Sequence, residues 1–110
     1  MNKQTGYATF RGVVGKITRQ KEHMHVMLFV NAMNRHGHQV GRKIYNIYLF
    51  DTAFTSTTPY LKEGDHIHFD NVEIDVSDDC KVFFRVKQST DVLIIAKENR
   101  NTLLGRLNNF

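Results

Sequence analysis

Apolar and polar residues alternate with period two along most of this 110-residue chain, in stretches rich in Val, Ile, Phe and Tyr. Clusters of Gly, Asn, Asp and Ser separate these stretches. Such alternation puts every second side chain on one face of a strand, so it predicts β-structure. We expect strands at Ala8 to Arg19, His25 to Met33, Lys43 to Phe50, Asp65 to Val76, Lys81 to Lys87 and Asp91 to Ala96. The strand at Asp91 to Ala96 could instead continue the one at Lys81 to Lys87 after a kink at Ser89 and Thr90. The chain is therefore predicted to be mainly all-β.

The connections between these strands predict two hairpins and one helix. Asn34 to Gly41 has two glycines and no apolar stripe, which indicates an exposed hairpin loop, and Ser77 to Cys80 indicates a tighter one. We expect a short helix at Pro59 to Glu63, with Thr57 or Thr58 as N-cap, because proline fits the first turn of a helix. The resulting β-β-β-α-β-β order is that of a five-stranded Greek-key OB-fold barrel, with one short helix between strands 3 and 4.

Length and composition indicate a single domain. With 41% apolar residues the chain can close one core, which we assign to residues 1–97, leaving residues 98–110 as a short C-terminal tail. Cys80 is the single cysteine, so no intrachain disulfide can form. No apolar run approaches the ~18 residues of a membrane span. The sequence therefore predicts a soluble, cytoplasmic protein with no membrane partner.

Positive charge is concentrated in the first half of the chain. Residues 1–50 contain eight Lys and Arg and one acidic residue, a net charge of +7. Residues 51–110 contain seven Lys and Arg and ten acidic residues, a net charge of −3, so the total is +4. A basic half of this kind is typical of a protein that binds polyanions.

Residues 44–74 contain an ordered series of short motifs. An apolar strand ends in an aromatic residue, and it is followed by a Tyr-Leu-basic-x-Gly turn and a further strand. The pattern resembles the centre of the bacterial and phage single-stranded-DNA-binding protein family, through Leu49, Phe50, Tyr60, Leu61, Lys62, Glu63, Gly64, Ile67 and Phe69. Val13 to Ile17 and Phe29 to Arg35 are similar to the first and second strands of that family.

The resemblance implies an OB fold, single-stranded DNA as partner, with RNA as an alternative, and assembly into a symmetric dimer or tetramer. The chain departs from the family pattern in two ways. It contains no Trp, so base stacking would depend on Tyr and Phe. It ends in RLNNF where the family has an acidic tip with a final Pro-Phe, so we expect no partner-recruiting tail.

The third predicted strand is the main candidate for contact with bases. Period two places Asn46, Tyr48 and Phe50 on one face and the alternate residues on the other. The resemblance implies that Phe50 stacks on a base, and Tyr48 and Asn46 share its face. Aromatic rings stack on any base for about 1–3 kcal/mol each, while Lys and Arg contact phosphates. The alternative is that Tyr48 and Phe50 fill the barrel, with the two faces exchanged.

Other segments supply further candidate contacts. The exposed loop from Asn34 to Lys43 would wrap a nucleic-acid strand. On the fifth strand, Phe83 would stack on a base, whereas Phe84 would lie in the core. The candidates outside the third strand are Lys16, Arg19, Arg35, His36, Arg42, Lys43, Phe83, Arg85 and Lys87.

Three His-x-His pairs are the feature that could support a metal site. They are His23 with His25, His36 with His38, and His66 with His68. Residues two apart on a strand share a face, so each pair could hold one metal ion. No recognisable carboxylate motif accompanies them. We therefore expect polar-face histidines that add positive charge in acidic solution, with no metal, cofactor, small-molecule substrate or enzymatic activity.

The sequence thus predicts sequence-independent binding of single-stranded DNA. Its biological setting would be protection or presentation of DNA in replication, recombination or the transfer of phage or plasmid DNA. The alternative is an OB-fold subunit whose basic surface contacts proteins in a replication or mobile-element complex.

Overall fold

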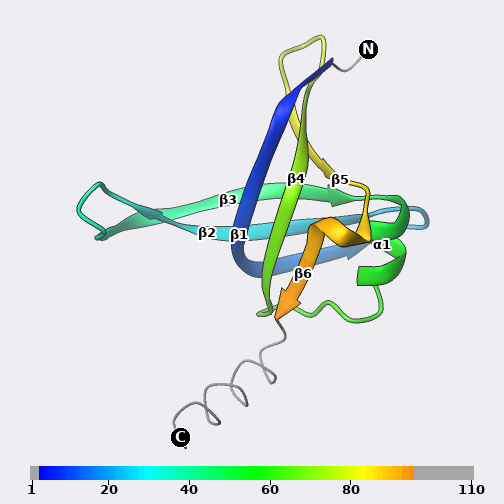
Figure 1. The fold of residues 1–110 in the computed structure, drawn as a ribbon, viewed down its shortest axis with the longest axis horizontal. Coiled ribbons are helices and arrows are strands. Elements are labelled where there is room, and N and C mark those ends of the chain that lie inside the picture. Colours follow the sequence, from blue (N-terminus) through cyan, green and yellow to red (C-terminus); the bar gives the residue numbers. More distant parts are fainter. Residues whose placement is uncertain (1–2, 96–110) are drawn as a thin grey trace, which may run out of the picture.

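The structure, a computed structural model, describes the backbone of residues 3–95 and the side chains of residues 6–95. The proposed tail, residues 98–110, lies outside the described residues. The elements are β1 (Lys3–Arg19), β2 (Met24–Met33), β3 (Gln39–Leu49), α1 (Asp51–Thr57), β4 (His66–Val76), β5 (Val82–Val86), the 3-10 helix η1 (Ser89–Asp91) and β6 (Val92–Ile95) (Figure 1). In this part of the chain, no helix is long and apolar enough to cross a membrane.

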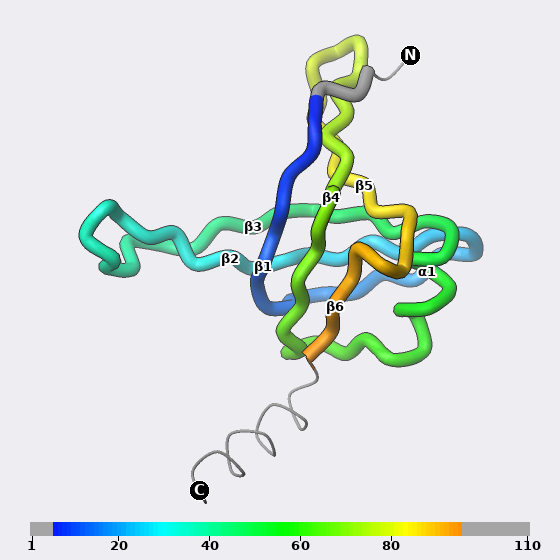
Figure 2. Tube along the Cα trace, in the orientation of Figure 1, coloured from blue at the N-terminus to red at the C-terminus, as the bar shows by residue number. Residues whose placement is uncertain are grey.

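Five of the strands close into a ring. The long strand β1 bends sharply, so that residues 3–13 pair with β4 and residues 13–19 pair with β2 (Figure 2). β2 pairs with β3, and the ring closes through β5, which lies parallel to β3 and antiparallel to β4. This arrangement confirms the predicted all-β OB-fold barrel. β6 does not continue β5, because it pairs with the first residues of β4 on the outside of the ring.

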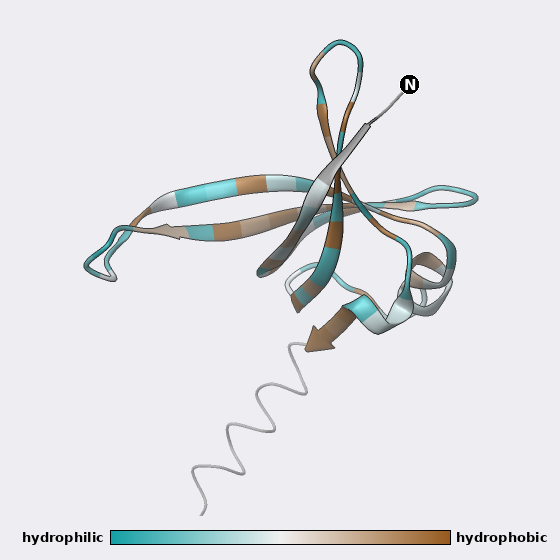
Figure 3. Ribbon diagram, turned by 45° about the horizontal axis from the view of Figure 1, so that its top comes forward, coloured by the Kyte–Doolittle hydropathy of each residue, from teal (hydrophilic) through white to brown (hydrophobic). Residues whose placement is uncertain are grey.

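The core is formed by the inward side chains of each strand. On β3, Ile47 and Leu49 are fully buried, whereas Asn46 is exposed and Tyr48 is partly exposed. The alternative in which the two faces of this strand are exchanged is therefore wrong. Phe84 packs against Phe10, with the ring centroids 5.0 Å apart, and this confirms its predicted place in the core. Figure 3 shows how hydrophobic and hydrophilic residues alternate along the strands.

The helix begins and ends earlier than predicted. α1 follows β3 directly, with Phe50 as N-cap, and its C-cap is Thr58. The prediction of a helix from Pro59 to Glu63 was wrong because Pro59 lies just after the helix end, where its missing N–H prevents continuation. Ala53 and Thr57, one helical turn apart, are the buried residues of the helix, so the segment that packs inward precedes Pro59.

The β2–β3 hairpin is longer than predicted and projects from the barrel (Figure 1). β3 begins at Gln39, inside the segment predicted as a loop, so the turn is confined to about residues 34–38. The side-chain oxygen of Asn34 accepts hydrogen bonds from the backbone N–H groups of His36 and His38. Gly37 has a φ of 81°, a conformation that glycine adopts without strain. A compact turn of this kind lets both strands continue far beyond the core.

Candidate nucleic-acid interface

The outward side chains of β2 and β3 form a continuous surface. On β2, Met24, Val26 and Leu28 are buried, so the alternate residues must face outward. The antiparallel register sets these outward residues opposite those of β3. We call this surface the β2–β3 platform, and it comprises His23, His25, Met27, Phe29, Asn31, Arg42, Ile44, Asn46, Tyr48 and Phe50.

One end of the platform carries stacked aromatic pairs. The rings of His25 and Tyr48 have centroids 4.9 Å apart and planes inclined by 21°. The rings of His23 and Phe50 lie 5.3 Å apart and are inclined by 23°. His25 Nε2 lies 2.8 Å from Asn46 Oδ1, and because the amide oxygen can only accept, the imidazole N–H donates. The stacks and this hydrogen bond hold four rings as a broad, partly exposed aromatic surface.

The other end combines an aromatic ring with a guanidinium group. Arg42 Cζ lies 5.2 Å from the centroid of the Phe29 ring, within the range of a cation–π interaction. The Phe29 ring lies against Gly15, since a Cβ atom there would be 2.3 Å from Phe29 Cε2. A groove of 410 Å³ opens beside them, and Arg11 and His66 also line it. A ring, two guanidinium groups and an open groove thus adjoin one another.

Lys16 extends the positive charge of the platform. It is exposed and lies opposite Met27, directly after a bulge in β1. Arg35 and His36 are exposed in the turn of the projecting hairpin. Lys43 is also exposed, but it lies opposite Val30 and therefore points from the other face of the hairpin than Arg42 does. The structure thus brings Lys16 and Arg42 to the platform and leaves Lys43 on its reverse side.

Arg19 has a structural task that the sequence did not indicate. Its Nε donates to the carbonyl oxygen of Thr58 at 3.1 Å and to the Thr58 hydroxyl at 3.2 Å. Its Nη2 donates to the carbonyl oxygen of Leu61 at 2.8 Å. The guanidinium therefore holds the segment after α1 against β1. These bonds use Nε and Nη2 and leave other N–H donors of the exposed guanidinium, so the predicted phosphate contact of Arg19 stays a prediction.

The candidates on β5 are also engaged by neighbours. Arg85 Nε lies 3.0 Å from Asp75 Oδ2, and Lys87 Nζ lies 3.4 Å from Glu73 Oε2. Phe83 is half-buried on the same face of β5 as Arg85, as predicted. Arg85 approaches the platform, with its Cζ 5.9 Å from the centroid of the Phe50 ring. Carboxylates compensate both cations, so β5 contributes less positive charge than the sequence predicted.

The outward residues of β2 lie on the platform although the sequence pattern did not lead us to predict them as contacts. His23 and His25 were predicted to be polar-face histidines rather than stacking residues, and Met27 and Phe29 were not predicted to be contacts. The period-two argument that we used for β3 also holds for β2. It would have placed all four of these side chains on the outer face. Across residues 6–95, no three His, Cys, Asp or Glu side chains are grouped so that they could hold a metal ion.

Comparison with known proteins supports the fold. No protein-family model and no curated protein sequence matches the chain. The structure is similar to the crystal structure of Schizosaccharomyces pombe Pot1pC bound to single-stranded DNA of sequence CGGTTACGGT. The TM-score is 0.60, with 14% identical residues, and the match covers 94% of this chain and 89% of that chain. At this identity the likeness shows the fold alone. The resemblance to the bacterial and phage family stays a prediction.

Proposed function

We propose that this protein binds single-stranded DNA without sequence preference on the β2–β3 platform. The observation that carries the proposal is the alignment of stacked rings at one end of the platform with Arg42 over Phe29 at the other. OB folds bind oligonucleotides on the face of strands 2 and 3. The similar Pot1pC structure is described as bound to single-stranded DNA, which supports the same class of ligand.

The chemistry of the platform favours stacking over base-edge recognition. Successive outward residues of a strand lie about 7 Å apart, so the rows of the platform offer several stacking positions in sequence. Lys16 and Arg42 border these rows and would neutralise phosphates. Within residues 3–95, neither of them forms an ion pair with a carboxylate. Stacking on rings is tolerant of sequence because every base has a flat face.

The wider biological role belongs to the same proposal. A protein that covers bases by stacking would protect or present single strands during replication, recombination or DNA transfer in the cytoplasm. It would act as a binder rather than an enzyme, and a dimer or tetramer would multiply the sites. RNA is the alternative ligand, because base stacking and phosphate contacts do not distinguish ribose from deoxyribose.

Binding to oligo-dT at several salt concentrations tests the proposal. We expect quenching of tyrosine fluorescence, because Tyr48 lies on the platform, and preference for the single strand over a duplex of the same length. The slope of log K against log salt should be about −0.7 for each phosphate neutralised. If micromolar protein shows no salt-sensitive binding to oligo-dT or to oligo-U, the proposal is wrong, and the protein-interaction alternative takes its place.

A further inference from the structure

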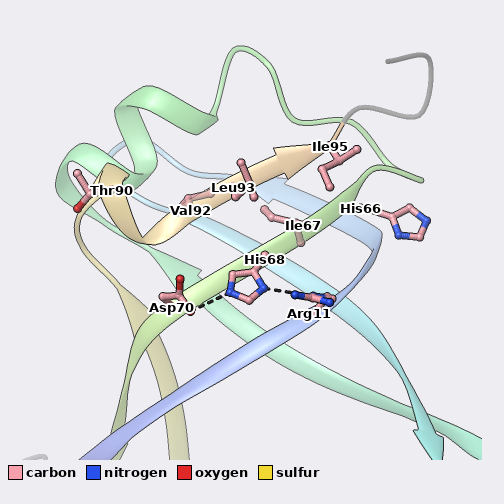
Figure 4. A pocket seen from close by; sticks show the side chains of 9 residues that line it. All are labelled: Arg11, His66, Ile67, His68, Asp70, Thr90, Val92, Leu93 and Ile95. Atoms are coloured by element: carbon pink, nitrogen blue, oxygen red, sulfur yellow. Dashed lines mark hydrogen bonds and ion pairs between the residues drawn. The ribbon is translucent and has the colours of Figure 1, made fainter. Parts of the chain in front are cut away.

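A second groove lies on the outer face of β1, β4 and β6 (Figure 4). It has a volume of 610 Å³, and Arg11, His66, His68, Leu93 and Ile95 are among the residues that line it. The strand register explains this set. Arg11 lies opposite His68, which lies opposite Leu93, and His66 lies opposite Ile95. The groove therefore has basic and imidazole groups on β1 and β4 and apolar side chains on β6.

A chain of hydrogen bonds orders the polar side of this groove. Arg11 Nε donates to His68 Nδ1 at 3.3 Å, and His68 Nε2 lies 2.8 Å from Asp70 Oδ1 (Figure 4). Because Nδ1 accepts from Arg11, the proton of the neutral ring is on Nε2 and is donated to Asp70. Asp70 is thus engaged by His68 and also by the hydroxyl of Thr9 at 3.4 Å. Within residues 3–95, Arg11 forms no ion pair with a carboxylate.

This groove is continuous with the platform. Arg11 and His66 line both the second groove and the groove beside Phe29 and Arg42. Directly opposite residues also form one row across five neighbouring strands of the sheet. The row consists of Ile44, Phe29, Val13, His66 and Ile95. A ligand that leaves the platform at Phe29 therefore meets Arg11 and His66 next, without crossing a region of negative charge before Asp70.

We propose that a bound single strand longer than the platform continues over β1 into the groove between β4 and β6. This inference rests on the proposed function and names a second segment of the same site. Arg11 neutralises a phosphate at the crossing, and bases lie against Leu93 and Ile95, which are 59% and 41% exposed. The continuity with Arg42 and Phe29 favours nucleic acid over a protein as the occupant, although the apolar side of the groove would suit either.

The test compares two lengths of labelled oligo-dT, roughly 6 and roughly 16 nucleotides, near the two ends of the site sizes of single OB folds. Wild-type protein should bind the longer one more tightly and with a steeper salt slope. Arg11→Ala should weaken the longer complex by about 5-fold to 10-fold and lower its salt slope by about 0.7, and it should weaken the shorter complex clearly less.

Leu93→Glu is a second variant that does not depend on the hydrogen bonds of Arg11. It places a negative charge in the groove at an exposed position and should weaken only the longer complex. Val82→Glu, at an apolar position of similar exposure, 53%, on β5, is the matched control and should bind as wild type. Thermal unfolding of each variant shows that the fold is retained.

Three results would contradict the inference or its premise. If Arg11→Ala and Leu93→Glu bind the longer oligonucleotide as wild type does, the groove is not part of the path and a protein ligand becomes the better candidate. If they weaken both lengths equally, these residues act at the platform alone. If wild-type protein binds neither length, the proposed function itself fails.

Discussion

The β2–β3 platform and the hairpin of β4 and β5 contain the same types of residue but differ in the partners of their cations. Each supplies an arginine that approaches a phenylalanine ring of the platform: Arg42 at Phe29, and Arg85 from the hairpin at Phe50. Arg85 also contacts the carboxylate of Asp75 at 3.0 Å. Arg42 has no ion pair with a carboxylate among the residues that the structure describes. The same pair of residue types is therefore available to a ligand in one place and internally compensated in the other.

The difference extends over the whole hairpin. Lys81 lies 3.6 Å from Asp79, and Lys87 lies 3.4 Å from Glu73, so each cation that the sequence offered there has an acidic neighbour. Positive charge that is paired within the protein attracts a polyanion weakly, because the pair presents a dipole rather than a net charge. Counting Lys and Arg along the sequence thus overestimates the positive charge that this hairpin offers to a ligand.

The largest expected effect on DNA affinity comes from removing the stacking surface of the platform. The double variant Tyr48→Ala, Phe50→Ala removes two rings, each worth about 1–3 kcal/mol in base stacking. We therefore expect binding to oligo-dT to weaken by roughly 30-fold or more. Tyr7→Ala is the matched control, because Tyr7 is 63% exposed and lies on β1 opposite Glu73, away from the platform. Fluorescence anisotropy measures all three proteins, and equal affinities would show that the stacking face is misassigned.

The two arginines allow a direct test. Arg42→Ala should weaken binding by about 5-fold to 10-fold and reduce the salt slope by about 0.7, because a phosphate contact is lost. Arg85→Ala should change binding by less than about 2-fold, since its charge is already compensated. It should instead lower the free energy of unfolding by about 1–3 kcal/mol, because it leaves the Asp75 carboxylate, 7% exposed as a residue, without its partner.

Denaturant unfolding and a salt titration of both arginine variants provide the measurements. If Arg85→Ala reduces the salt slope as much as Arg42→Ala does, the two arginines do not differ in their availability to the ligand. That result would mean that the ion pair with Asp75 opens when the ligand binds.

A smaller effect on DNA affinity is expected when Lys87 loses its acidic partner. Glu73→Gln keeps the shape of the side chain but removes the charge that faces Lys87. Binding should strengthen by about 2-fold to 3-fold at low salt, with a slightly steeper salt slope. Glu63→Gln serves as a control, since it removes one negative charge at an exposed position between α1 and β4, outside the hairpin and both grooves. If Glu73→Gln binds no better than wild type, Lys87 lies beyond the reach of the ligand even when its charge is free.

The smallest effect concerns the turn of the hairpin. The hydroxyl of Ser77 donates to the Asp79 carboxylate, and this hydrogen bond lowers the pKa of Asp79 below its ordinary value. A lowered pKa in the folded state stabilises the protein above the ordinary pKa of aspartate, and this contribution is lost as the pH falls through the lowered value. Ser77→Ala should therefore raise the pKa of Asp79 and reduce stability slightly at neutral pH but not in strong acid.

A carbon NMR titration of the aspartate carboxyl groups follows this change. The wild-type protein, titrated under the same conditions, provides the reference. An Asp79 that titrates at the same pH in wild type and in Ser77→Ala would contradict the role of the hydroxyl.

Local pattern was sufficient to predict the strands and the faces of β3 and β5. Ile47, Leu49 and Phe84 lie inside as the period-two alternation required, because burial on one side of a sheet leaves no other arrangement. The helix was placed wrongly because Pro59 can stand at either end of a helix, and the choice depended on which residues the barrel buries. The alternation of apolar and polar residues does not show which residues of this segment the barrel buries.

The ion pairs could not be predicted because they depend on strand pairing. Asp75 and Glu73 lie on β4, and their partners are Arg85 on β5 and Lys87 directly after it, so the register of the two strands determines which charges meet. Arg19 is similar, since its acceptors Thr58 and Leu61 lie far along the chain. The platform residues of β2 could have been predicted from the sequence, because they alternate with the buried residues of that strand.

The contact between Gly15 and Phe29 has a consequence for how this surface can evolve. Any side chain at position 15 must displace the Phe29 ring, which lies beneath the Arg42 guanidinium. Positions 15 and 29 should therefore vary together among related proteins, with a side chain at the first accompanied by a smaller residue at the second. A relative that acquires only the first change would keep the fold while losing part of its ligand surface.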